Sequence, residues 1–126
     1  MAEPPLQQKH VLVVDDEPTV RSSVQLLLKG AGYIVDEAAS GTEALAMFEP
    51  GKYDMIFTDY LMPKMCGDEL AATIKKLSPK QQVAMVTAFP ELLQGSGYPL
   101  AGVDSVICKP FGLHTLLWAI HRFAAN

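Results

Sequence analysis

The distribution of apolar and polar residues along the chain predicts strands and helices in alternation. Five short apolar runs are expected to form or begin strands: His10 to Val14, Tyr33 to Val35, Tyr53 to Thr58, Gln82 to Thr87 and Val103 to Cys108. The segments between these runs place their apolar residues at helical spacing instead. Strands that alternate with helices indicate a parallel sheet covered by helices on both faces.

The helical segments also carry signals for their ends. Pro18 near the start and Gly30 past the end of the first helix fit the preferences of helix termini. The sequence Ser40 to Glu43 is a capping box that opens a second helix with Leu45 and Phe48 inward. The other predicted features are an inner face of Val20, Val24, Leu27 and Leu28 in the first helix, one of Leu70, Ile74 and Leu77 in the third, and a last helix from about Gly112 to Phe123.

The whole chain is expected to form a single domain. With 126 residues, 49% of them hydrophobic and 19% charged, it has the composition of a well-cored globule. Residues 1–9 are polar and proline-rich and are expected to be a disordered lead, with the domain over residues 10–126. The interval from Phe89 to Gly102 contains two prolines and two internal glycines, so the fourth of about five helices is expected to be short or irregular.

The charge and hydropathy of the chain argue against some classes of binding partner. The net charge is −4, with 10 basic and 14 acidic residues, which offers no basic surface for direct contact with nucleic acid. No apolar run approaches the roughly 18 residues that would cross a membrane, and the first ten residues lack the core of a signal peptide. Cys66 and Cys108 are far apart and have no metal-binding or redox spacing. A cytoplasmic protein without membrane contact, with both cysteines reduced, is therefore expected.

Residues suited to metal and phosphate chemistry follow four of the predicted strands. They are Asp15 and Asp16 after the first strand, Asp59 after the third, Thr87 after the fourth and Lys109 after the fifth. In a flavodoxin-like sheet of order 2-1-3-4-5 the first and third strands are neighbours, so their three carboxylates converge at the ligand-binding edge. Clustered carboxylates near a core repel unless a cation compensates, and oxygen donors suit Mg²⁺. The sequence therefore predicts a site for Mg²⁺ and a phosphate.

The residues after the strand ends resemble those of a known family. The sequences D-D (15–16), D-Y-L-M-P (59–63), T-A (87–88) and K-P-F (109–111) resemble the receiver domain of two-component response regulators. The resemblance extends over the chain from residue 10 onward. It implies that Asp59 accepts a phosphoryl group from a phosphohistidine on a sensor histidine kinase or a histidine phosphotransfer protein.

The resemblance also implies roles for the neighbouring residues. Asp15, Asp16 and Asp59 would hold Mg²⁺ together with the backbone carbonyl of Leu61, while Lys109 supplies positive charge and Thr87 donates a hydrogen bond to the phosphoryl group. The protein would then be a signalling switch rather than an enzyme, catalysing only its own phosphorylation and slow dephosphorylation. Val106 stands three residues before the lysine, where the family usually has Tyr or Phe, so an altered switching mechanism is expected.

Competing hypotheses differ in the residues that they require. A receiver-like interaction module that acts without phosphorylation has no need to retain three repelling carboxylates. A phosphoaspartate hydrolase typically carries D-x-D-x-T after its first strand, but Asp59 is followed by Tyr60 and Leu61, and a flavin carrier would need a Ser/Thr/Gly-rich phosphate loop. On the last helix, a second stripe of His114, Trp118 and His121 is either a partly buried flank or a surface for an effector or a second copy of the chain.

Overall fold

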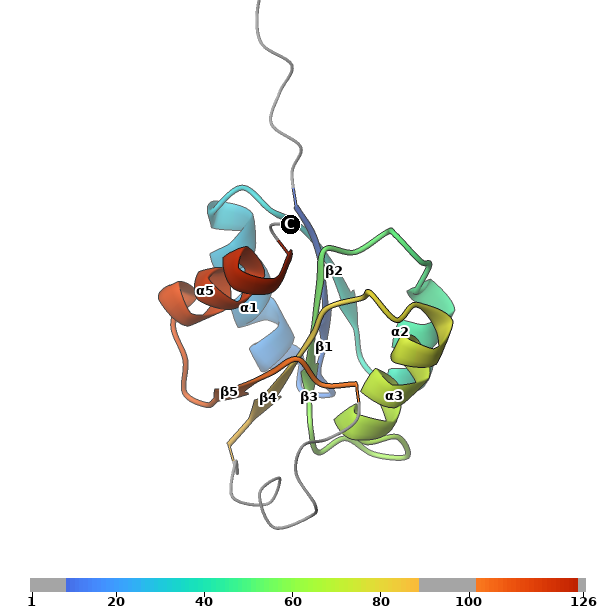
Figure 1. The fold of residues 1–126 in the computed structure, drawn as a ribbon. Coiled ribbons are helices and arrows are strands. Elements are labelled where there is room, and N and C mark those ends of the chain that lie inside the picture. The colour runs from blue at the N-terminus through green and yellow to red at the C-terminus, as the bar shows by residue number, and fades with distance from the viewer. Residues whose placement is uncertain (1–8, 89–101, 125–126) are drawn as a thin grey trace, which may run out of the picture.

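A five-stranded parallel sheet in the order β2-β1-β3-β4-β5 forms the centre of the protein (Figure 1). The computed structural model describes residues 9–88 and 102–124. The strands are β1 (His10–Val14), β2 (Ile34–Ala38), β3 (Met55–Asp59), β4 (Val83–Thr87) and β5 (Ser105–Cys108). The predicted fold class is thus confirmed, including the strand order of a flavodoxin-like sheet.

Helices cover the sheet from both sides. The described helices are α1 (Pro18–Gly30), α2 (Gly41–Met47), α3 (Gly67–Leu77) and α5 (Leu113–Ala124). Helices α1 and α5 lie together against one face, and α2 and α3 lie against the other (Figure 1). The expected short fourth helix and residues 1–8 of the expected N-terminal lead fall outside the described residues. Among the described helices, none is both long and apolar enough to cross a membrane.

The core consists of two layers because successive side chains of a strand point to opposite faces. In β1, Val11 and Val13 face α1 and α5, whereas Leu12 and Val14 face α2 and α3. All four side chains are at most 3% exposed. Burial of β1 on both faces explains why its sequence is a continuous apolar run rather than an alternating one.

The capping box predicted for the second helix is present. Ser40 Oγ accepts a hydrogen bond from the Glu43 N–H at 3.1 Å, and Glu43 Oε1 accepts one from the Ala39 N–H at 3.0 Å. The end of the first helix differs from the prediction, because Gly30 is still helical and Gly32, with a φ of 97°, makes the left-handed turn. Only glycine adopts that φ readily, which fixes the point at which the chain leaves α1 for β2.

Two residues predicted on the inner faces of helices are exposed instead. Leu77 is 57% exposed because it is the last residue of α3, beyond the reach of the sheet. Leu27 is 37% exposed because α1 meets the sheet through a narrower stripe, and Leu27 lines a surface groove with Phe111. The inward prediction for Leu70 and Ile74 is confirmed, since both are fully buried.

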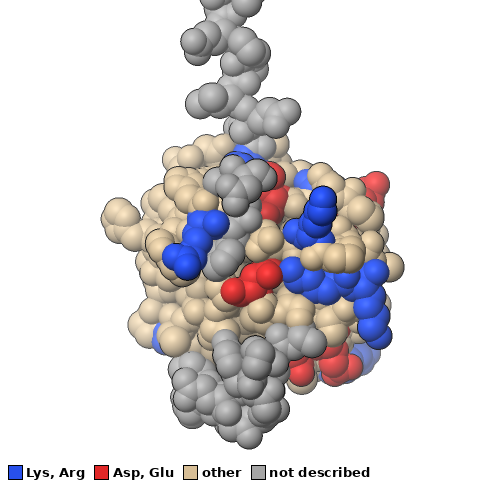
Figure 2. Space-filling model, viewed as in Figure 1, with Lys and Arg blue, Asp and Glu red and all other residues tan. Residues whose placement is uncertain are grey.

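Ion pairs tie the outer elements to the sheet edges. On the face drawn in Figure 2, basic side chains gather over α3, whose own basic residues are Lys75 and Lys76, with acidic side chains beside them. Lys75 of α3 lies 2.8 Å from the carboxylate of Asp104, which also accepts a hydrogen bond from the Val83 N–H at 2.7 Å. Because Asp104 just precedes β5, this arrangement anchors the chain that enters β5 to α3 and β4.

Candidate functional site

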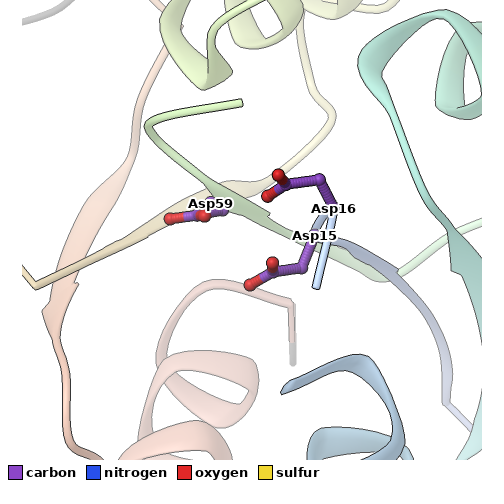
Figure 3. Close-up of side chains that lie close together, drawn as sticks. All are labelled: Asp15, Asp16 and Asp59. Atoms are coloured by element: carbon purple, nitrogen blue, oxygen red, sulfur yellow. The ribbon is translucent and has the colours of Figure 1, made fainter. Parts of the chain in front are cut away.

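The ends of β1 and β3 bring three carboxylates together. Val14 pairs with Thr58 in the sheet, so the residues that follow, Asp15 and Asp59, lie side by side. Carboxylate oxygens of Asp15, Asp16 and Asp59 all lie within 4.8 Å of one another. Figure 3 shows the three side chains close together at the ends of β1 and β3. The convergence predicted from the strand order is therefore present.

Asp15 is the most enclosed member of the cluster, with 3% of its surface exposed. Its Oδ1 accepts a hydrogen bond from the Glu17 N–H at 2.9 Å, and its own N–H donates to the Ala38 carbonyl at 3.1 Å. Its carbonyl accepts a hydrogen bond from the Arg21 guanidinium at 2.7 Å. Asp16 is exposed at the surface of the turn. The pair thus combines one rigidly held carboxylate with one that faces solvent.

Asp59 is the last residue of β3, and its carboxylate is 12% exposed. Its Oδ1 accepts a hydrogen bond from the Tyr60 N–H at 2.9 Å, which fixes the plane of the carboxylate. Burial, followed by the negative charge of Asp15, raises the pKa of Asp59 to about 6, against the lowering effects of Lys109 and the Tyr60 N–H. The carboxylate is therefore mainly ionised at neutral pH, at an electrostatic cost.

Lys109 supplies positive charge beside the carboxylates of Asp15 and Asp59. Its Nζ lies 3.4 Å from Asp15 Oδ2 and 3.5 Å from Asp59 Oδ1. The Lys109–Pro110 peptide bond is cis, and the Lys109 N–H donates to the Thr87 carbonyl at 2.8 Å. These contacts hold the lysine at the same sheet edge as the carboxylates.

The two remaining residues predicted for the site, Thr87 and Leu61, lie near the carboxylates and differ in exposure. Thr87 is 1% exposed at the end of β4 and pairs with Cys108 in the sheet. Leu61 lies two residues after Asp59, and its side chain is 47% exposed. Val106, which replaces the expected aromatic, is partly buried in β5.

Gly67 is a residue of the site that sequence reasoning missed. Its N–H donates to the Tyr60 carbonyl at 2.8 Å, which closes the loop between β3 and α3. A Cβ at this position would overlap the Asp59 carbonyl oxygen and lie 2.8 Å from Met85 Sδ. A glycine after Asp59, shortly before the inner-face residues predicted for the third helix, was the available signal. Arg21 was also missed, because its partner is a main-chain oxygen.

The donor set fits a hard divalent cation. Its three side chains offer only oxygen ligands, and Mg²⁺ is typically bound by one or two carboxylates together with water and phosphate oxygens. A soft metal such as zinc would favour histidine or cysteine ligands, which the cluster does not contain. The residues present thus match the chemistry predicted from the sequence.

Comparisons with known proteins give a consistent result. The family model of the response regulator receiver domain matches residues 11–121. The chain is 36% identical over 105 residues to the probable transcriptional regulator ycf27 of Cyanidium caldarium, and 31% identical over 121 residues to the aerobic respiration control sensor protein ArcB of Escherichia coli (strain K12). These alignments cover 83% and 94% of this chain, but only 42% and 16% of the two relatives.

A solved structure extends the similarity to three dimensions. The response regulator protein TrrA from Thermotoga maritima, in complex with Mg²⁺ and BeF, aligns with a TM-score of 0.83 and 31% sequence identity. The alignment covers 92% of this chain and 99% of that one.

Proposed function

The chain belongs to the response regulator receiver family, and we propose that Asp59 accepts a phosphoryl group from a phosphohistidine of a partner protein in a Mg²⁺-dependent reaction. The observation that carries the proposal is the convergence of three carboxylates and Lys109 Nζ at one sheet edge. The Mg²⁺ in the TrrA complex and the similarity to ArcB, a sensor protein, support the choice of metal and of donor.

In the proposed reaction a carboxylate oxygen of Asp59 attacks phosphorus. The bond between phosphorus and the imidazole nitrogen of the donor breaks, a bond to the Asp59 oxygen forms, and the imidazole leaves with the electron pair. The product is a mixed anhydride, which water can later hydrolyse. The Tyr60 N–H orients the nucleophile, and the ionised state of Asp59 at neutral pH provides its lone pair.

Transfer passes through a loose transition state in which charge spreads over the three equatorial oxygens. When bound by Asp15, Asp16, Asp59 and the Leu61 carbonyl, Mg²⁺ would neutralise part of this charge. Lys109 is within reach of the same region and supplies a second positive charge. The Thr87 hydroxyl, at the end of the adjacent strand, donates a hydrogen bond to a phosphoryl oxygen.

In this proposal the protein is a signalling switch that catalyses only its own phosphorylation and its own slow dephosphorylation. The partner is a sensor histidine kinase or a histidine phosphotransfer protein. On phosphorylation the Asp59 side chain then changes from one negative charge on its carboxylate to about two on the phosphoryl oxygens. The competing hypothesis, a receiver-like interaction module without phosphorylation, predicts no covalent change at Asp59.

Intact mass spectrometry after incubation with a small phosphodonor and Mg²⁺ separates these hypotheses. We expect the parent protein to gain the mass of one phosphoryl group and Asp59→Asn to gain none. Asp68→Asn, which alters a carboxylate in the first turn of α3, is the matched control and should still be phosphorylated. A gain that persists in Asp59→Asn would contradict the assignment, and no gain in the parent would favour the interaction module.

A further inference from the structure

An arginine side chain from α1 holds the main-chain carbonyl of Asp15. Arg21 Nη1 donates to this oxygen at 2.7 Å, the shortest of the hydrogen bonds described around Asp15. The Asp15 N–H is held by the Ala38 carbonyl and its Oδ1 by the Glu17 N–H. Arg21 therefore fixes the remaining main-chain group of this residue.

Arg21 is itself held in place from two sides. Its N–H donates to the Glu17 carbonyl at 3.1 Å within the first turn of α1, and its Nε lies 3.5 Å from Glu37 Oε1. The Arg21 and Glu37 side chains are only 17% and 29% exposed, so the pair is shielded from solvent. A guanidinium presents several donors in a rigid planar fork, which allows one side chain to bind both oxygens. A lysine carries its donors on a single nitrogen at the end of a flexible stem, so it lacks the fork that holds both oxygens in a fixed geometry.

The contact controls the direction of the chain at Asp16. A peptide unit is planar, so fixing the Asp15 carbonyl also fixes the Asp16 N–H and the position of the Asp16 Cα. Asp16 is exposed, and side-chain packing therefore constrains it less than it constrains Asp15. The orientation of the Asp16 carboxylate toward the other two thus depends on this peptide plane.

The positive charge of Arg21 lies near the acidic cluster, but the guanidinium does not bind the carboxylate oxygens that could hold a metal ion. The guanidinium binds a main-chain oxygen and Glu37, whereas Lys109 lies against the carboxylates of Asp15 and Asp59. Arg21 can therefore offset repulsion within the acidic cluster while leaving the carboxylate oxygens available to a cation.

We propose that Arg21, supported by Glu37, is a positioning residue that directs Asp16 toward Asp15 and Asp59 and so sets the affinity of the site for Mg²⁺. The proposal deepens the function above and rests on Mg²⁺ binding by the three carboxylates. Partners that orient metal ligands commonly change metal affinity by about 10-fold to 100-fold when removed.

The test is a Mg²⁺ titration of the ¹⁵N-labelled full chain, followed by the amide signals of Asp15, Asp16 and Asp59. We expect Arg21→Gln and Arg21→Lys each to weaken Mg²⁺ binding by about tenfold, and Glu37→Gln by several-fold. Lys29→Gln, the same loss of charge as Arg21→Gln but in the last turn of α1, should stay within about twofold of the parent. In metal-free protein, the Asp16 amide signal should move in the Arg21 variants, while the dispersion of the other signals is retained.

The possible outcomes distinguish a positioning role of Arg21 from an effect of net charge or of misfolding. Parent-like affinity in Arg21→Lys would overturn the proposal, because the charge is retained and only the bridging geometry is lost. Equal weakening in Lys29→Gln and Arg21→Gln would also overturn it, in favour of net charge alone. If Arg21→Gln fails to fold, Arg21→Lys and Glu37→Gln decide the question. A parent protein that does not bind Mg²⁺ would overturn the proposed metal site as well, whereas parent-like binding by the Arg21 variants refutes the positioning role alone.

Discussion

At the scale of single residues, Asp59 carries an electrostatic cost that follows from its position. Its carboxylate is mostly enclosed and faces that of Asp15, and Lys109 compensates only in part. These surroundings raise its pKa from 3.8 to about 6. A carboxyl group whose pKa is higher in the folded than in the unfolded protein binds its proton more tightly when folded, so its ionisation destabilises the fold.

We therefore predict that Asp59→Asn stabilises the metal-free protein in a pH-dependent manner. Below about pH 4 the group is protonated in both states and the cost is absent, whereas above about pH 6 it is ionised in both and the cost is fully present. The difference in free energy of unfolding between Asp59→Asn and the parent should rise over this interval, to at most about 3 kcal/mol. Urea denaturation in EDTA at a series of pH values measures it.

Asp104→Asn provides a control outside the acidic cluster. Asp104 is paired with Lys75 and accepts the Val83 N–H, so its neutralisation should destabilise the protein at pH 7. A stability difference for Asp59→Asn that is flat between pH 4 and pH 7 would show that Asp59 is less enclosed than the structure indicates.

Individual site residues were predictable to different degrees. Asp15, Asp59 and Lys109 follow predicted strands, and parallel strands bring such positions to one edge, so their convergence could be inferred from the sequence. Arg21 could not be identified in this way. Its role depends on a main-chain oxygen and on Glu37 of β2, and no sequence spacing encodes the distances among them.

At the scale of elements, the start of α3 lacks a favourable side-chain cap. Cys66 is the N-cap residue, with extended backbone angles, and its side chain makes no capping hydrogen bond. We predict that Cys66→Ser raises the free energy of unfolding by about 0.5–1 kcal/mol, because a serine hydroxyl can accept a hydrogen bond from a free N–H of the first turn. Urea denaturation is the measurement. Cys108→Ser, at the exposed end of β5, is the control and should change stability by less than about 0.5 kcal/mol.

Equal effects of the two cysteine substitutions would indicate that the removal of a thiol, rather than the new cap, is responsible. A loss of stability in Cys66→Ser alone would mean that packing of the half-buried sulfur outweighs the hydrogen bond.

The next residue of the same helix should respond in the opposite direction. Gly67→Ala places a methyl group against the Asp59 carbonyl and Met85 Sδ, and the strand carbonyl cannot move without disturbing the β3–β4 ladder. We predict a loss of about 1–3 kcal/mol in the free energy of unfolding. In Gly30→Ala no atom lies within 4 Å of the added Cβ, so this matched control in α1 should be neutral or stabilising. Thermal melts of both variants check the prediction, and a neutral Gly67→Ala would refute the close approach of α3 to Asp59.

Element types were predictable because the helical segments repeat their apolar residues at helical spacing, whereas the buried strands are short continuous apolar runs. The buried face of each helix was less predictable, because Leu77 and Leu27 were predicted to face inward and are exposed. Helical spacing predicts which residues share one side of a helix, but it does not predict where the sheet that covers that side ends. The carboxyl end of β3 also differs slightly, because Asp59 is still paired with Val86 and is the last residue of the strand. That pairing helps to hold the proposed nucleophile in place.

At the scale of the whole molecule, the site joins strands at the centre of the sheet. Strands β1 and β3 are neighbours there, although about 40 residues separate Asp15 from Asp59 along the chain. The unfolded chain does not hold these carboxylates together, so a cation bound by all three stabilises only the folded state. Binding should therefore raise the global stability by mass action.

We predict that Mg²⁺ raises the thermal unfolding midpoint of the parent protein. At ten times its dissociation constant the gain in free energy is about 1.4 kcal/mol, which for a domain of this size corresponds to roughly 5 °C. Asp15→Asn should lose most of this gain, since it removes the most enclosed of the three candidate ligands. NaCl at matched ionic strength separates specific binding from screening of the acidic cluster. If NaCl raises the midpoint as much as Mg²⁺, or if Asp15→Asn responds to Mg²⁺ as the parent does, the three carboxylates do not act together as a metal site.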